Sequence, residues 1–353
     1  MAEPRKQRSG IWFVTRKYPP SVGGMERLSY ELTTRIARRR PARILARRGN
    51  APPLPLFILA STVRVAVGAL RHQIAVLHLG DPVLAPVGCL AHAMGVPVVV
   101  TVHGLDVTYP HPLYRAWLRL FLRGFEAYVC ISAAARDAVL ARGVGSERTC
   151  IIGIGIDPAP RVAIPRETDL LVFVGRIVPR KGLGWFVANV LPRVRQRRPA
   201  VRMVAIGDGP DRARAEAAAR DAGVASVVQF VGAVGDPEKN AWLARATVCV
   251  MPNVPVEGDL EGYGIAALEA AAAACPLVAA DIEGLRDAIE HGRGGVLVPA
   301  GDTNAWTEAL VEWLDHPTTA AAFGEAAREW VLRERGWEGI CDAYERVLET
   351  VRR

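Results

Sequence analysis

Short apolar runs alternate along the chain with longer segments in which apolar residues recur every three or four positions. The first kind predicts buried strands and the second predicts amphipathic helices. Strand-like runs occupy 11–15, 74–79, 96–102, 127–131, 170–174, 201–206, 227–231, 248–251 and 277–280. Helix-like segments occupy 26–40, 86–94, 114–123, 133–142, 183–196, 216–222, 265–274, 306–314, 319–333 and 340–351. This alternation predicts an α/β fold whose parallel sheets are covered by helices on both faces.

A polar, proline-rich stretch interrupts the alternation at residues 157–168, which include Asp157-Pro158-Ala159-Pro160 and Pro165. Such a composition is typical of a linker between domains. The length of 353 residues also suits two hydrophobic cores better than one. We therefore expect domains at 1–160 and 161–335, with a final helix at 336–353 set apart by a break at Gly336.

Charge is distributed unevenly over these two halves. Residues 1–160 carry a balance of +12 and residues 161–353 one of −4, which together give the net charge of +8. Seven arginines gather between Arg35 and Arg48. This cluster suits an anionic membrane surface, a phosphorylated acceptor or nucleic acid, although no nucleic-acid motif accompanies it. An arginine-rich, solvated helix face would produce the same pattern.

Six cysteines occur without any C-x-x-C pair, which favours free thiols in a reducing compartment over disulfides or a metal site. No secretory signal is visible at the start. The longest apolar run, 54–70, contains Arg64 and is marginal in length for a membrane span. The expected location is cytoplasmic, with peripheral membrane association as an extension of the charge argument.

Two candidate binding elements lie in the first half. Gly23 and Gly24 stand between a strand and a helix, where two small residues expose backbone N–H groups to an anion; a simple tight turn is the alternative. His103 and Gly104 follow the strand that ends at Val102. Ligands of open α/β sheets bind at the carboxyl ends of strands, so His103 is positioned to meet a sugar hydroxyl or a phosphate. A purely structural histidine is the competing interpretation.

The loop after the strand 170–174 reads Gly175-Arg176, then Lys181-Gly182. Two cations on a glycine-rich strand-to-helix loop suit a diphosphate, because arginine gives planar bidentate contacts and lysine a mobile point charge. The alternative is a pair of solvated loop cations.

The most informative segment runs from Glu261 to Glu269, out of a glycine-rich loop and into an apolar helix. Backbone N–H groups around Tyr263 and Gly264 are candidates for binding phosphate, and the two carboxylates for binding hydroxyls of a sugar and a ribose. A helix-dipole partner and a solvated glutamate are the alternatives for the two acidic residues.

Two further glycine pairs invite comparison with dinucleotide-binding loops. Gly153-Ile154-Gly155 and Gly207-Asp208-Gly209 both lack the third glycine of that fingerprint. The second pair follows a strand and fits a loop beside a nucleotide equally well.

Taken together, these motifs resemble those of the retaining glycosyltransferases of family 4, which have the GT-B fold. The resemblance covers nearly the whole chain and is carried by 23–26, 103–104, 175–182, 207–210 and 261–269. It implies two facing Rossmann-like domains with parallel sheets, the first binding the acceptor and the second a nucleotide sugar such as a UDP- or GDP-sugar. It also implies that the last helix returns to the first domain.

The same resemblance implies roles for single residues. Arg176 and Lys181 would hold the donor diphosphate, with Gly175 and Gly207 in the adjoining loops. Glu261 would contact donor-sugar hydroxyls and Glu269 the ribose. Gly23 and Gly24 would shape the phosphate side of the cleft, and His103 would touch the transferred sugar. We expect neither a metal ion nor a cofactor, and an acceptor that is a glycan, a lipid-linked sugar or a small molecule.

Two departures from the family pattern are visible. The chain has Gly153-Ile154-Gly155 where the family often has Pro-Asn-Gly, and Glu283-Gly284 where it often has Gly-Gly. A sugar-nucleotide epimerase and a catalytically silent nucleotide-sugar-binding protein are the alternative functions.

Overall fold

The computed structural model describes residues 10–21, 23–49, 51–162 and 164–352. Contacts divide the chain into two compact units: the first holds the described residues up to Gly155 together with those from Trp337 onward, and the second holds Ile156–Gly336. The divisions fall close to the boundaries expected at 160 and 335.

The first unit contains a six-stranded sheet in the order β2-β1-β3-β4-β5-β6, with every pair parallel. Its strands are β1 (Gly10–Thr15), β2 (Ala42–Ala46), β3 (Ile74–Leu79), β4 (Val98–Val102), β5 (Ala127–Cys130) and β6 (Thr149–Ile151). Its helices are α1 (Gly24–Arg39), α2 (Leu54–Leu70), α3 (Ala85–Ala93), α4 (Leu105–Thr108), α5 (Pro112–Phe121), α6 (Ala133–Leu140) and α15 (Trp337–Arg352).

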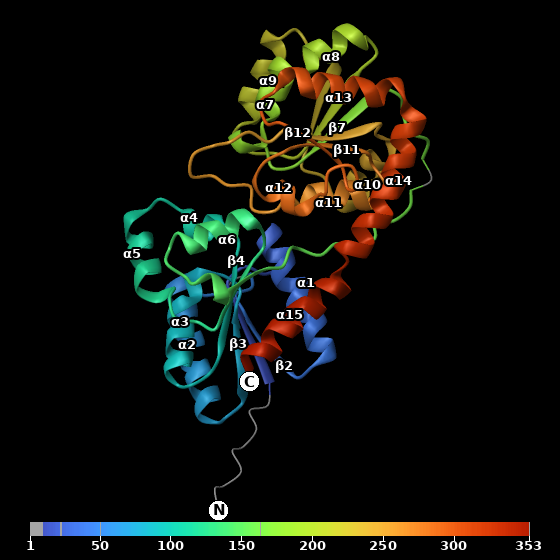
Figure 1. Ribbon diagram of the computed structural model, residues 1–353. Coiled ribbons are helices and arrows are strands. Elements are labelled where there is room, and N and C mark those ends of the chain that lie inside the picture. Colours follow the sequence, from blue (N-terminus) through green and yellow to red (C-terminus); the bar gives the residue numbers. More distant parts are fainter. Residues whose placement is uncertain (1–9, 22, 50, 163, 353) are drawn as a thin grey trace, which may run out of the picture. The chain divides into compact units, whose positions relative to one another are not determined.

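Helices cover both faces of this sheet. In the first unit, α2, α3 and α5 gather on one side, and α1 and α15 lie together on the other (Figure 1). The core between these layers is closed by aromatic residues such as Phe13, Tyr128 and Tyr344, all fully buried. The α15 residue Tyr344 meets Thr101 of β4 at 3.2 Å, so the last helix supplies part of the first unit's core.

The second unit repeats the plan with a parallel sheet in the order β12-β11-β10-β7-β8-β9. Its strands are β7 (Leu170–Val174), β8 (Arg202–Ile206), β9 (Val228–Gly232), β10 (Val248–Met251), β11 (Leu277–Ala280) and β12 (Val296–Val298). Its helices are α7 (Leu183–Asn189), α8 (Leu191–Arg197), α9 (Arg212–Asp221), α10 (Asp236–Arg245), α11 (Ile265–Ala272), α12 (Glu283–Ala288), α13 (Thr303–Asp315) and α14 (Pro317–Glu334). The predicted fold class, α/β with two Rossmann-like units and parallel sheets, is confirmed.

Several element predictions were incomplete or wrong. The single helix expected at 183–196 is two helices, because Pro192 lacks the N–H that would continue the first one past Val190. The short strands β2, β6 and β12 and the helices α2, α4, α10 and α12 were not predicted. The six cysteines are free, four of them buried and Cys89 and Cys150 half-buried.

The apolar run 54–70 forms the surface helix α2. Over the residues that the structure describes, none of the helices combines the length and the apolar character that a bilayer crossing requires.

Candidate functional site

The strand order of the second unit places its candidate site. The chain runs from β7 outward to β9 and then returns to the other side of β7 with β10, so the order reverses between β7 and β10. Crevices outside the carboxyl ends of strands at such a reversal are where open α/β sheets bind ligands. The loop after β7 carries Arg176, Arg180 and Lys181, and the loop after β10 carries Asn253 and Glu261.

These two loops are joined by one carboxylate. Lys181 Nζ lies 2.6 Å from Glu261 Oε2, and Arg180 Nη1 lies 2.9 Å from the same oxygen. Asn253 Nδ2 donates a third hydrogen bond to it at 2.8 Å. Three donors therefore converge on Oε2, and no partner meets Oε1 anywhere in the described part of the chain. Glu261 is thus fixed through one oxygen and keeps the other as an acceptor for a ligand hydroxyl.

The electrostatics of this arrangement keep Glu261 ionised. Burial by itself raises the pKa of the Glu261 carboxyl, but Lys181 and Arg180 lower it more, so the net shift is below the usual value. Both Lys181 and Glu261 are only 7% exposed, so their attraction is weakly screened. A buried carboxylate that stays charged is suited to accept hydrogen bonds from neutral hydroxyls.

Two more carboxylates border this cluster. Arg180 Nε also donates to Asp259 at 3.0 Å, and the Glu283 carboxylate accepts the backbone N–H of Glu261 at 2.5 Å. Burial and the charge of Glu261 raise the pKa of Glu283, against the lowering effect of that hydrogen bond. Glu283 adopts φ of +44°, a conformation that favours glycine. At Glu283-Gly284, where the sequence departs from the family pattern, the chain therefore places a carboxylate from a strained backbone position beside Glu261.

Arg176 differs from its two neighbours. It is exposed, and within the described ranges no carboxylate pairs with it. Its loop is held against the loop after β8, where a side chain on Gly207 would place Cβ 1.9 Å from the Gly175 carbonyl oxygen. The predicted pair Arg176 and Lys181 is therefore on one loop but in different states, since Lys181 is paired with Glu261 and Arg176 is not.

Glu269 lies on α11, the helix that follows the loop containing Glu261. Its carboxylate is 2.9 Å from Lys239 Nζ of α10, and both side chains are about 15% exposed. Burial lowers the pKa of Lys239, but the Glu269 and Asp236 carboxylates raise it by a larger amount. The net shift is upward, so the ammonium group stays charged. Glu269 is therefore not simply solvated, and Lys239 is a partner that the sequence interpretation missed because α10 itself was not predicted.

The start of α11 is shaped by Gly264, which has φ of +79° and would place a Cβ 2.4 Å from Leu285 Cδ2. Tyr263 is 3% exposed, so its ring belongs to the core. The predicted phosphate contact at these two positions thus rests on the backbone. Asn253 is buried, and its Oδ1 has no hydrogen-bond partner among the described residues.

The first unit has a reversal of its own, between β1 and β3. Arg16 after β1 donates to Asp81 after β3 at 2.9 Å, and Asp81 is completely buried. Asp81 Oδ2 has no hydrogen-bond partner in the described structure. Neither residue was singled out from the sequence, although both directly follow strands at the carboxyl edge.

His103 lies beside this pair at the end of β4. Its Nε2 is 3.0 Å from the Gly80 carbonyl oxygen. A carbonyl only accepts, so Nε2 carries a proton and donates to it. The backbone N–H of His103 donates to the buried carboxyl of Asp106 at 2.9 Å. Burial is the main reason that the pKa of Asp106 rises to about 6.

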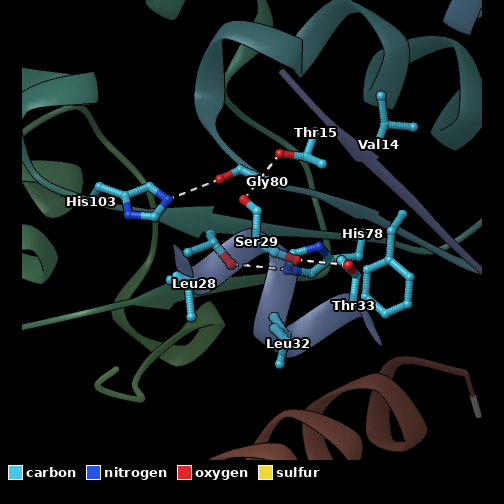
Figure 2. A pocket seen from close by; sticks show the side chains of 11 residues that line it. Val14, Thr15, Leu28, Ser29, Leu32, Thr33, His78, Gly80 and His103 are labelled. Carbon is cyan, nitrogen blue, oxygen red and sulfur yellow. Dashed lines mark hydrogen bonds between the residues drawn. The ribbon is translucent and has the colours of Figure 1, made fainter. Parts of the chain in front are cut away.

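A cavity of about 10 Å³ is lined in part by His103 and lies between α1 and the strands β1, β3 and β4 (Figure 2). That is room for about one water molecule. Its polar lining comes from Thr15, Ser29, Thr33, His78 and Thr101. His78 is fully buried, and burial together with the neighbouring His103 lowers its pKa to about 3, so the ring is neutral. The cavity is an internal feature, too small for a sugar.

Gly23 and Gly24 begin α1, with Gly23 as the N-cap residue and Gly24 as the first residue of the helix. A Cβ on Gly23 would lie 2.5 Å from Glu26 Oε2. Glu26 is buried and pairs with Lys17 at 3.1 Å. The structure thus places this loop at the carboxyl edge of β1, near Arg16 in sequence, and the predicted phosphate role of the two glycines stays a prediction.

The geometry can be set beside known proteins. Residues 22–160 match the model of Glycosyltransferase Family 4, and residues 168–316 match that of Glycosyl transferases group 1. The chain is 29% identical over 378 residues to the GDP-mannose-dependent alpha-(1-6)-phosphatidylinositol monomannoside mannosyltransferase of Mycobacterium tuberculosis strain H37Rv, covering 94% of this chain and 96% of that protein.

The counterpart from Mycolicibacterium smegmatis is 30% identical over 307 residues, which cover 80% of this chain and 78% of that protein. Among solved structures, sucrose-phosphate synthase from Thermosynechococcus elongatus superposes with a TM-score of 0.79 at 20% identity, covering 98% of this chain and 99% of that one.

These findings define the class: two parallel-sheet Rossmann-like units with the GT-B fold, and a carboxylate–cation cluster at a strand-order reversal. The chain belongs to glycosyltransferase family 4, the glycosyl transferases of group 1, and is a glycosyltransferase.

Proposed function

We propose that this glycosyltransferase moves a sugar from a nucleoside-diphosphate sugar to a hydroxyl of a glycan or lipid-linked acceptor, with retention of anomeric configuration and without a metal ion. The observation that carries the proposal is the Glu261 carboxylate, fixed by three donors on Oε2 and open at Oε1. An ionised, oriented acceptor at a strand-order reversal suits the hydroxyls of a bound sugar.

Two cations support a nucleoside diphosphate as the leaving group. When the bond between the sugar C1 and the diphosphate oxygen breaks, negative charge develops on the departing nucleoside diphosphate. Arg176, which is unpaired in the described structure, and Lys181 stand on one loop and stabilise that charge. Lys181 forms an ion pair with Glu261, which already fixes the position of its ammonium group. A bound diphosphate would therefore meet a cation that is oriented in advance.

Retention follows from a same-face path, in which the acceptor hydroxyl attacks C1 from the side that the leaving group has just left. The acceptor proton passes to the departing phosphate oxygen, so no side chain serves as nucleophile. In this path Glu261 serves as an acceptor of hydrogen bonds from the donor sugar, and Lys181, Arg180 and Asn253 hold it in place.

A GDP-sugar is the first donor to test, with GDP-mannose foremost, because two relatives that match over 94% of this chain are named as GDP-mannose-dependent. Their acceptor is a phosphatidylinositol mannoside by name, which supports a lipid-linked acceptor here.

A thermal-shift screen against GDP-, UDP-, ADP- and dTDP-sugars tests the donor. We expect a stabilising shift with the GDP-sugar that vanishes in Glu261→Gln combined with Lys181→Ala. NMR of the product from the best donor then reads the anomeric configuration, and added EDTA tests metal independence. Inverted product, or activity that EDTA abolishes, would contradict the corresponding part of the proposal.

A further inference from the structure

Helix α2 exposes an unusual number of apolar side chains. Leu56, Leu59, Val63, Val67 and Leu70 are between 41% and 70% exposed, and their spacing puts them on one stripe of the helix. The opposite stripe is buried against the first unit. A helix that is apolar all round is normally buried all round, so the exposed half of α2 lacks a partner.

Helix α5 lies in the same layer of the first unit, and α3 contacts both α2 and α5 (Figure 1). Leu113 and Leu120 are 76% and 73% exposed. Arg115 and Arg119 are exposed on the flank of the same helix. Seven of the twelve strongly exposed large apolar residues in the described chain therefore lie on α2 and α5.

The charged residues of α2 and α5 are all arginines, and the half-buried Glu126 pairs with His92 of α3. Between Leu32 and Phe125 the only two acidic residues are Asp81 and Asp106, and both are buried. Helices α2, α3 and α5 contain none. No carboxylate in the described part of the chain pairs with Arg64 or Arg71 of the α2 region, nor with Arg115 or Arg119.

The arginine cluster at 35–48 is different, although the sequence pointed to it as the docking surface. Arg39 is bound by Glu338, Asp342 and Glu345 of α15, and Arg40 by Glu345 and Glu349. Arg43 stacks on Trp12 and Arg48 on Tyr18. Much of this cluster's charge is therefore matched or engaged inside the first unit, and Arg39 and Arg40 face α15, on the side of the sheet away from α2.

We propose that the exposed faces of α2 and α5 form a surface that binds an anionic lipid bilayer, with the apolar stripe at the level of the headgroups and Arg64, Arg71, Arg115 and Arg119 on lipid phosphates. Amphipathic helices with apolar and arginine-rich faces bind bilayers in this way. A second copy of the chain fits less well, because a two-fold contact would bring the same arginines together. Nucleic acid would contact the arginines but would leave the apolar stripe of α2 without a partner.

This inference deepens the proposed function, since it says where a lipid-linked acceptor is met, but its test requires no turnover. Sedimentation with vesicles of phosphatidylcholine containing about one third phosphatidylglycerol is the readout. The wild-type protein binds at low salt, binds less at physiological salt, and binds weakly to phosphatidylcholine alone.

Charge reversal gives the matched comparison. Each arginine near an anionic surface contributes about five-fold in partitioning, so Arg115→Glu with Arg119→Glu weakens binding by at least about 25-fold. Arg214→Glu with Arg220→Glu on α9 of the second unit makes the same change in net charge and has little effect. Leu59→Gln with Val63→Gln weakens binding by about ten-fold while leaving the fold intact, because both side chains are already exposed.

Three results would overturn the inference: wild-type protein that stays in the supernatant at low salt, α5 and α9 reversals that act equally, or a dimer that Leu59→Gln with Val63→Gln dissolves. Donor-induced thermal shifts, measured on the same variants without vesicles, report separately on the proposed function. Loss of vesicle binding with normal donor binding therefore concerns this surface alone.

Discussion

The two units have the same kind of strand-order reversal but carry different charged groups at it. Each sheet reverses its strand order once, and at each reversal an ion pair joins the loops on either side: Arg16 to Asp81 in the first unit, and Lys181 with Arg180 to Glu261 in the second. The first pair has one cation and leaves Asp81 Oδ2 buried without a partner. The second has two cations and an amide on one oxygen and leaves Glu261 Oε1 open.

The difference indicates what each pair does. A single buried pair is sensitive to the loss of either partner, because an uncompensated buried charge remains. The second cluster retains a cation when one is removed, so its integrity is less dependent on Lys181. We therefore expect the same kind of substitution to affect stability in the first unit and sugar transfer in the second.

The largest expected effect is that of Lys181→Ala on transfer. Removing one donor to developing charge costs about 3–4 kcal/mol of activation free energy, a fall in kcat of roughly 100- to 1,000-fold. Arg180 continues to hold Glu261, so the free energy of unfolding changes little. Steady-state kinetics and urea unfolding on one preparation measure both. Arg176→Ala is the companion variant, and wild-type rates in both variants would remove the diphosphate assignment.

Arg16→Ala should have the opposite effect to Lys181→Ala, with a loss of stability and little change in donor binding. Asp81 is left buried and unpaired, which lowers the free energy of unfolding by about 3 kcal/mol. Donor binding, measured by the nucleotide Kd, stays at its wild-type value. Arg16→Ala with Asp81→Asn recovers much of the lost stability by removing the stranded charge. If the single variant is as stable as the wild type, the contrast between the two reversals fails.

One buried acid in each unit, Asp106 in the first and Glu261 in the second, differs from the other in the sign of its pH dependence. The pKa of Asp106 is raised to about 6, so the folded state holds this proton more tightly than the unfolded chain, whose pKa is near 4. Stability from this group is full below about pH 4 and is lost as pH rises to about 6, by roughly 2–3 kcal/mol. Asp106→Asn removes that slope.

Glu261 behaves oppositely, because its pKa is lowered and its contribution is lost only as pH falls below the usual glutamate range. Urea unfolding of wild type, Asp106→Asn and Glu261→Gln across this pH range compares the two directly. Slopes of the same sign for the two groups would contradict the assigned shifts.

The smallest expected effect concerns Glu269→Gln. In the wild-type protein Lys239 orients the Glu269 carboxylate, and the substitution replaces this charged acceptor, proposed to bind a ribose hydroxyl, with a neutral amide. We expect the nucleotide Kd to rise about ten-fold with kcat nearly unchanged, equal to about 1.4 kcal/mol. Isothermal titration with the free nucleoside diphosphate measures this. Lys239→Met serves as the comparison, and an unchanged Kd in both variants excludes the ribose role.

Much of the architecture followed from the periodicity of the sequence, because strands buried on both faces read as continuous apolar runs, as at Leu170–Val174 and Val248–Met251. The short edge strands did not, since Ala42–Ala46 carries an exposed arginine and Val296–Val298 has three residues. Helix α2 was missed as a helix because its apolar residues surround the axis and show no polar face.

The site was found through glycine-flanked motifs, which mark loops at strand ends in the sequence itself. The partners of those residues come from elements distant in the chain and have no local signature. Lys239 lies on an unpredicted helix, and the Arg16–Asp81 pair joins residues 65 positions apart. That three donors share one oxygen of Glu261 is a matter of side-chain geometry, which spacing does not encode.

The return of α15 to the first unit has a consequence for biosynthesis. The core residues Trp337 and Tyr344 are synthesised after the whole second unit, whereas the strands that they help to cover are synthesised before it. Domains generally fold in the order of synthesis, but here the second unit is complete in sequence before the first. During translation the first unit therefore has a sheet face that α1 covers without α15, and its packing is completed only after the second unit has been synthesised.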